Sequence, residues 1–205
     1  MARLFLLLVW LAQLGLVLLL TDARWIEEQV ATEAEQLVTH FGSHRAQHLS
    51  EQAQAIFDRY FITTAMVSKS YAMLLPDPTV PQHGMTEVAP WFFAWLRQRI
   101  DVAWLLTSHG ILRVLLLCEW LPLTLMMIAV ACVDGHVQRR IKRAEHALAS
   151  ADRYVLARRA SLIALAFPAF YVVLPLVVSP LVVAAWGAYT AIIAMLLMAH
   201  AQHRI

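Results

Sequence analysis

The most constraining feature of this sequence is one long apolar stretch, Leu162–Ala199. Its 38 residues include no Asp, Glu, Lys, Arg or His. One α-helix of that length would rise about 57 Å, whereas the hydrocarbon core of a bilayer is about 30 Å thick. Because proline disfavours helix at itself and at the residue before it, we expect a break at Ser179-Pro180, with Pro175 one turn earlier. The stretch therefore predicts a hairpin of two membrane-spanning helices, at about residues 161–178 and 181–199.

Two further apolar blocks are long enough, or nearly long enough, to cross a membrane. Ile111–Val133 has about 23 residues, and Leu4–Leu20 has 17 residues interrupted only by Gln13 and Gly15. The block at Leu4–Leu20 is open to a second interpretation, as a secretory signal peptide with a poor cleavage site near residues 21–23. We favour an uncleaved anchor because the apolar run is long for a signal peptide. With the hairpin, the sequence predicts an all-α membrane protein with four transmembrane helices.

The composition excludes several other classes of protein. Apolar residues make up 60% of the chain and charged residues 15%, against roughly 45–50% (counting Gly) and about 25% in ordinary globular chains. A soluble domain of this size has too little interior to bury so much apolar surface. The formal net charge of +2 is also far from that of a protein that binds nucleic acid directly.

The distribution of Lys and Arg predicts the topology. Segment 134–160 contains seven basic residues and three acidic ones, whereas segment 22–110 contains six basic and ten acidic ones. The positive-inside rule therefore places segment 134–160 in the cytoplasm, together with both termini, and segment 22–110 in the periplasm of a bacterium. We expect a multi-pass protein of the bacterial inner membrane. Its predicted parts are an N-terminal anchor (1–21), a periplasmic helical segment (22–110), a second transmembrane helix (111–133), a basic cytoplasmic loop (134–160), a transmembrane hairpin (161–199) and a cytoplasmic tail (200–205).

Within the periplasmic segment, apolar residues recur every three or four positions from Arg24 to Leu75, which predicts amphipathic helix. Gly42-Ser43 should interrupt it, and prolines from Pro76 to Pro81 predict a loop. A further helix should begin at Pro90 and lie near the outer membrane boundary before the second span.

Three histidines, His40, His44 and His48, follow one another at a spacing of four residues. Two such histidines on one helix face are a known metal-binding arrangement. The first and third would be about 12 Å apart along a helix, so all three cannot bind one ion. We therefore favour a solvated polar face over a metal site.

The second span contains polar side chains that are costly in a bilayer. Glu119 should face other helices or water, as a structural hydrogen-bonding group or as a proton-relay or docking carboxylate. Arg113 lies within a turn of the boundary and should extend toward the water. Cys118 and Cys132 lie about 21 Å apart on one helix and cannot form a disulfide with each other.

The sequence contains no nucleotide-binding, hydrolase, zinc-protease or C-x-x-C motif. We therefore expect a protein without enzymatic activity and without a cofactor. The basic loop either sets the topology alone or also docks anionic lipid, nucleic acid or a cytoplasmic ATPase. Its candidate docking residues are Arg139, Arg140, Lys142, Arg143, Arg158 and Arg159.

The region from Arg113 to Tyr171 resembles a known family. It combines Glu119-Trp120-Leu121-Pro122 in an apolar span with VDGHVQRRIKR at the span's end, followed by Arg153-Tyr154 and an apolar hairpin. This pattern is similar to the integrating conjugative element membrane protein family, a domain of unknown function found in conjugative plasmids and integrative elements. The resemblance implies a gene among transfer genes, commonly near the type IV coupling ATPase, and it assigns no catalytic residue. Asp134-Gly135 should close the second span, with the glycine in the helix-terminating turn.

We therefore expect a non-enzymatic inner-membrane component of a conjugative type IV secretion apparatus, which scaffolds or stabilises the coupling protein. The expected partners are membrane lipid, the coupling ATPase and further copies of the chain. Two alternatives stay open at this point. One is a small transporter or channel subunit that uses Glu119, and the other is an exclusion protein that acts in recipient cells.

Overall fold

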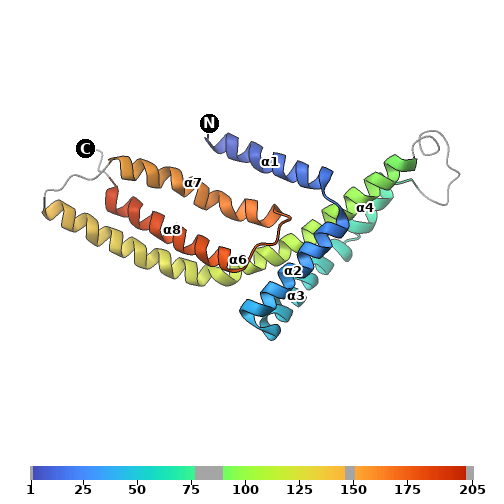
Figure 1. Cartoon of the computed structure of the whole chain (residues 1–205), viewed down its shortest axis with the longest axis horizontal. Coiled ribbons are helices and arrows are strands. Elements are labelled where there is room, and N and C mark those ends of the chain that lie inside the picture. The colour runs from blue at the N-terminus through green and yellow to red at the C-terminus, as the bar shows by residue number, and fades with distance from the viewer. Residues whose placement is uncertain (1, 77–89, 146–150, 202–205) are drawn as a thin grey trace. The chain divides into compact units, whose positions relative to one another are not determined.

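The computed structural model of the chain describes residues 2–76, 90–145 and 151–201. Every regular element in these ranges is a helix (Figure 1), which confirms the predicted all-α class for this part of the chain. The elements are α1 (Ala2–Leu20), α2 (Ala23–Phe41), α3 (Ser43–Phe57), the π-helical turn η1 (Asp58–Ile62), α4 (Met66–Leu74), α6 (Pro90–Ala144), α7 (Ala151–Val173) and α8 (Leu181–His200). The predicted proline-rich loop lies mostly outside the described residues.

Three of these helices, α6, α7 and α8, are long and apolar enough to cross a membrane. The count rises to four if α1 and α2, which meet at a bend of 113°, are taken together as one broken span. The finding supports a membrane-spanning helical protein. It agrees with the predicted four spans only when that bent pair counts as one.

The predicted interruption at Gly42 is confirmed. Gly42 has a φ of 78°, a left-handed value that side chains other than glycine rarely adopt. Its N–H donates to the carbonyl of Val38 and so satisfies the end of α2, and α3 begins at the next residue. At the other end of α2, the Asp22 side chain accepts from the N–H of Arg24 as an N-terminal cap.

Helix α6 is much longer than expected. It runs without a break over 55 residues, through both the predicted boundary at residue 111 and the predicted end at Asp134-Gly135. The helix-terminating role of Gly135 is therefore wrong. A Cβ atom on this residue would lie 2.5 Å from the carbonyl oxygen of Met195, so the glycine allows α8 to approach α6 closely.

The hairpin also differs from the prediction at its turn. Helix α7 ends at Val173 rather than near residue 178, because Leu174 precedes Pro175 and the residue before a proline disfavours helix. The break therefore forms at the first proline, and α8 begins after Pro180 as expected. Helix α7 also begins early, at residue 151, so much of the predicted basic loop is helical. Residues 174–180 form an irregular segment between α7 and α8.

The chain divides into two compact units. Unit 1 contains residues 1–6, 116–171 and 179–205. Within its described part, Trp186 of α8 donates from Nε1 to the carbonyl of Ala164 on α7 at 2.8 Å and stacks on Phe167. Gly187 of α8 lies against Thr124 of α6. A tryptophan therefore joins α8 to α7, and a glycine lets α8 lie close against α6.

Unit 2 contains residues 7–115 and 172–178. An aromatic cluster of Phe57, Phe61 and Trp104 joins α3 and η1 to α6. Trp104 also donates from Nε1 to the hydroxyl of Ser70 on α4 at 3.0 Å. Arg99 of α6 donates to three carbonyls at the end of α1, those of residues 18, 19 and 21. These contacts hold the first half of α6 against the helices that precede it in the sequence.

Candidate functional site

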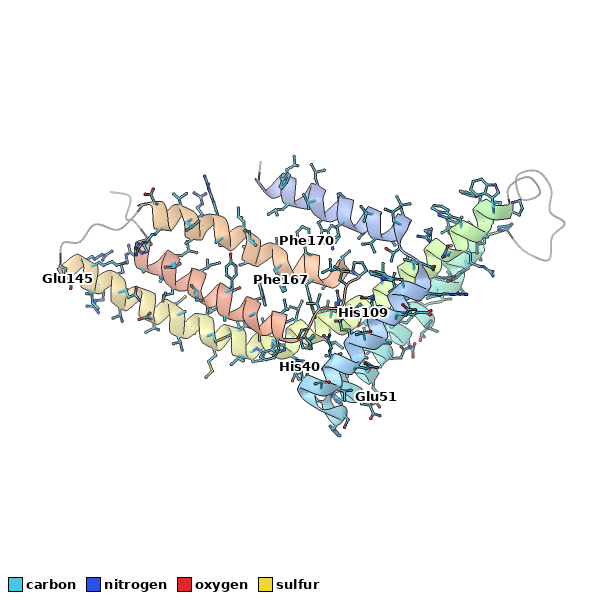
Figure 2. All side chains as sticks on the ribbon, in the orientation of Figure 1. His40, Glu51, His109, Glu145, Phe167 and Phe170 are labelled. Atoms are coloured by element: carbon cyan, nitrogen blue, oxygen red, sulfur yellow. The ribbon has the colours of Figure 1, made fainter. Side chains whose placement is uncertain are left out.

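A buried ionic cluster lies within unit 2, where α2 and α6 meet. The cluster consists of Glu33, His109 and Arg113, whose exposed fractions are 2%, 6% and 1%. The guanidinium of Arg113 binds the Glu33 carboxylate with two nitrogens, Nη2 to Oε2 at 2.5 Å and Nε to Oε1 at 3.1 Å. His109, labelled in Figure 2, places Nε2 3.2 Å from the same Oε2. A buried ion pair requires such dense hydrogen bonding because both charges have lost their water.

Arg113 also binds the irregular segment after α7. Its Nη1 donates to the carbonyl of Leu174, and its Nη2 donates to the carbonyl of Leu176 at 2.6 Å. Backbone carbonyls that leave a helix need other donors, and the guanidinium supplies them. Gln29 of α2 adds a long hydrogen bond, accepting at 3.4 Å from the N–H of Val177. The cluster therefore joins α2, α6 and segment 174–180.

All three cluster residues were missed or misplaced by sequence reasoning. The expectation that Arg113 extends toward water is wrong, because Glu33 and two backbone carbonyls hold it inside the protein. Glu33 is one of the ten acidic residues of segment 22–110, and no role was predicted for it. A signal was present, since Glu33 lies seven residues after Ile26 and four before Leu37, and all three are buried on one face of α2. Nothing in the sequence singled out His109.

The basic residues of segment 134–160 lie on helices in unit 1. Arg139, Arg140, Lys142 and Arg143 occupy the last turns of α6, and the other two lie in α7. The exposed members are Arg140, Arg143, Arg158 and Arg159.

Lys142 differs from the exposed arginines because it contacts another helix. Its Nζ lies 3.3 Å from Nε2 of the buried His200, the last residue of α8. This contact ties the end of α8 to the end of α6. The lysine therefore belongs to the internal packing of unit 1 as well as to its basic surface.

The remaining predicted residues stand apart from the cluster. His40, His44 and His48 are all exposed, and Gly42 separates the first from the other two. In the described ranges there is no group of three or more His, Cys, Asp or Glu side chains arranged to hold a metal ion. Glu119 is half-buried in α6, and its functional role stays a prediction. Cys118 and Cys132 are free thiols of that helix.

The helices define the class of this protein as an α-helical protein with three or four helices able to cross a membrane. Residues 18–202 match the model of the family described as IncC plasmid conjugative DNA transfer protein DtrJ-like. The chain belongs to this DtrJ-like family, because the match covers nearly all of it. No curated protein and no solved structure matches the chain. The link to conjugation is thereby confirmed, whereas the family carries a different description from the one that the sequence resembled.

Proposed function

We propose that this protein is a non-enzymatic inner-membrane component of the conjugative DNA transfer apparatus, which holds the type IV coupling ATPase at the membrane. Membership of a conjugative DNA transfer family and three or four helices able to cross a membrane support this proposal. The positive-inside rule predicts that the basic segment 134–160 lies in the cytoplasm, where we place the coupling ATPase. In that orientation the cytoplasmic side includes the ends of α6 and α8 and the start of α7. The irregular segment 174–180 and the helices of residues 22–110 then face the periplasm.

The observation that carries the docking role is the exposed basic surface of unit 1. Arg140, Arg143, Arg158 and Arg159 all expose their side chains from helices. A helix presents charges at fixed spacing, which lowers the entropy lost on binding compared with a flexible loop. Clustered cations attract an acidic protein surface and steer its encounter. Lys142 is unsuitable for testing the docking role, because a substitution there would also remove the contact with His200.

The test changes the four exposed arginines to glutamine. Arg139, Lys142 and Arg153 remain and keep this side of the protein basic, so the orientation in the membrane should be retained. We expect donor mating frequency to fall by at least about tenfold, a loss of about 1.4 kcal/mol of docking energy if transfer follows occupancy. The matched control changes the exposed Arg59 and Lys69, which lie on the other side of the predicted membrane, to glutamine.

Three readouts separate the outcomes of this experiment. Protein level shows whether the variant accumulates, and labelling of cysteines introduced at each end of the chain shows whether it is inserted correctly. Co-purification tests the contact with the coupling ATPase. Loss of transfer with correct insertion and with loss of co-purification supports the proposal. Normal transfer by the four-arginine variant contradicts the docking role, as does an equal defect in the Arg59 and Lys69 control.

A further inference from the structure

An apolar groove lies within unit 2, where α1, α3 and the end of α7 meet the first half of α6. Its volume is about 520 Å³, and all of its lining residues belong to unit 2. Thr107 is the only lining residue with a polar side chain, and its hydroxyl already donates to the carbonyl of Ala103 at 2.7 Å. An engineered apolar cavity of about 150 Å³ is large enough to bind benzene. The groove therefore has the size and the lining of a site for an apolar ligand.

The groove follows α6 for about the depth of one membrane leaflet. Its residues on this helix run from Ala103 to Leu115, which is a rise of about 18 Å. One leaflet of the hydrocarbon core is about 15 Å thick. Leu14 and Leu18 contribute to the lining from α1, whose apolar sequence ends at Leu20. A long apolar groove between such helices matches an extended acyl chain better than a compact ligand.

A cation lies at one end of this groove. Arg99 is one helical turn before Ala103, and its Nη1 donates at 3.1 Å to the carbonyl of Leu18, whose side chain lines the groove. All three hydrogen bonds of Arg99 come from Nη1. Among the described residues, Nη2 has no acceptor and the half-buried guanidinium has no acidic partner. Asp22 accepts instead from Gln98 at 2.9 Å. The positive charge of Arg99 is therefore not neutralised by these residues.

Trp95 marks this end of the groove as the membrane boundary. The guanidinium carbon of Arg99 lies 5.9 Å from the centre of the Trp95 ring. Tryptophan is enriched where the bilayer meets water. Arg99 also binds the carbonyls of Leu19 and Thr21, where the apolar sequence of α1 ends. In the predicted orientation, Arg99 therefore lies at the level of the lipid phosphates.

We propose that the groove binds one acyl chain of an anionic phospholipid, with the lipid phosphate on Arg99. The apolar lining buries the chain, and a guanidinium matches the geometry of a phosphate. Electrostatic attraction favours a lipid with a net negative charge over a zwitterionic one. This site uses none of the residues of the basic surface of unit 1, and the inference does not depend on the proposed docking of the coupling ATPase.

The experiment uses the full chain in phosphatidylcholine nanodiscs that contain a small fraction of phosphatidylglycerol with a photoreactive diazirine in one acyl chain. Mass spectrometry of the digested protein locates the crosslinks. Labelling of the groove residues on α1 and α6 should saturate as the fraction of this probe rises, because a single site fills. Labelling of an exposed apolar residue such as Leu165 on α7 should rise linearly, because bulk lipid contacts it. The same probe with a phosphatidylcholine headgroup should need about fivefold more lipid for half-saturation.

Ala103→Phe fills the groove and should remove the saturable labelling. The matched control is Ala94→Phe, which adds the same side chain at an exposed position of α6 and should leave the labelling intact. If Ala103→Phe does not fold, Leu14→Trp fills the groove from α1 and should have the same effect. The proposal is overturned if groove labelling in the wild type rises linearly, or if a folded groove-filling variant saturates as the wild type does.

The headgroup is tested separately at Arg99. Arg99→Gln should raise the fraction of phosphatidylglycerol probe at half-saturation about fivefold, whereas Arg99→Lys should not. Arg97→Gln is the control, because Arg97 is an exposed arginine of the same helix. Equal half-saturation in Arg99→Gln and the wild type overturns the assignment of the phosphate to Arg99. A disulfide between two copies of a Leu14→Cys variant would show that a second copy covers the groove, which also overturns the proposal.

Discussion

At the scale of single residues, burial decides what a charge does. Glu33 and Glu35 lie two positions apart on the same helix, yet Glu33 is 2% exposed and Glu35 is fully on the surface side. The first carboxylate binds Arg113 and His109, and the second faces solvent. The difference arises from the helical period, because residues 26, 33 and 37 share a face that residue 35 does not.

Glu33→Ala should destabilise unit 2 strongly. The substitution leaves Arg113 buried without its counter-charge, and breaking a buried pair in this way typically costs about 3–5 kcal/mol. Reversible denaturation in detergent micelles measures the free energy of unfolding. Glu35→Ala is the matched control and should change that free energy by less than about 0.5 kcal/mol. Equal effects of the two variants would contradict the importance of the cluster.

Tyr71 on α4 gives a prediction for alkaline pH. Burial, the hydrogen bond that its hydroxyl donates to Asp101 and the charge of Asp101 raise the pKa of Tyr71 to about 12. Because this pKa lies above the unfolded value of about 10, the stabilisation is complete below pH ~10 and disappears as the pH rises through ~12. Asp101→Asn should lower the pKa of Tyr71 toward its ordinary value. The measurement is tyrosinate absorbance of each protein minus that of its Tyr71→Phe counterpart, and an unchanged midpoint in Asp101→Asn would refute the contact.

At the scale of the helices, Gly135 is explained by the close approach of α8 to α6 and not by the end of a helix. Gly135 continues α6, and the carbonyl oxygen of Met195 lies only 2.5 Å from the position that its Cβ would occupy. Pro122 and Pro168 also lie inside helices, whereas Pro175 and Pro180 flank a break. Proline alone therefore did not decide where a helix ends. The end of α7 coincides both with Pro175 and with the carbonyls that Arg113 binds.

Gly135→Ala should separate α6 from α8. The added methyl group would meet a backbone carbonyl at 2.5 Å and the Cβ of Met198 at 2.9 Å, so the helices must shift, at a cost of about 1–3 kcal/mol. Gly15→Ala is the control, since nothing lies within 4 Å of its Cβ position and alanine favours helix. Thermal unfolding in nanodiscs should show a lower Tm for Gly135→Ala and an unchanged or higher Tm for Gly15→Ala. The opposite order would contradict the close contact.

At the scale of the whole molecule, family membership makes DNA transfer the relevant assay. If the chain is a component of the transfer apparatus, as proposed, a clean deletion in donor cells should reduce mating frequency by at least about a hundredfold, or about 2 orders of magnitude. The same deletion in recipients should have no effect, and expression of the chain in the donor should restore transfer.

The recipient arm separates the alternatives. A recipient that accepts redundant transfer after the deletion would identify an exclusion protein. Normal mating in both arms would leave the transport interpretation, which Glu119→Gln would then test.

The sequence by itself determined the class of this protein. Long uncharged apolar stretches have no stable place outside a bilayer or a large core, so length and hydropathy alone predicted an all-helical membrane protein. Gly42 was also predictable, because a left-handed turn between two amphipathic runs favours glycine locally. The pattern between Arg113 and Tyr171 was sufficient to indicate conjugation, which the family match confirmed.

The tertiary structure alone decided which charges meet. Glu33 and Arg113 are 80 residues apart, and the carbonyls of segment 174–180 lie a further 61 to 63 residues along the chain. Helical periodicity shows which face of a helix is buried but not which residue of another helix lies opposite. Packing between helices fixes that register, and it turned an arginine expected at the water boundary into the centre of a buried cluster.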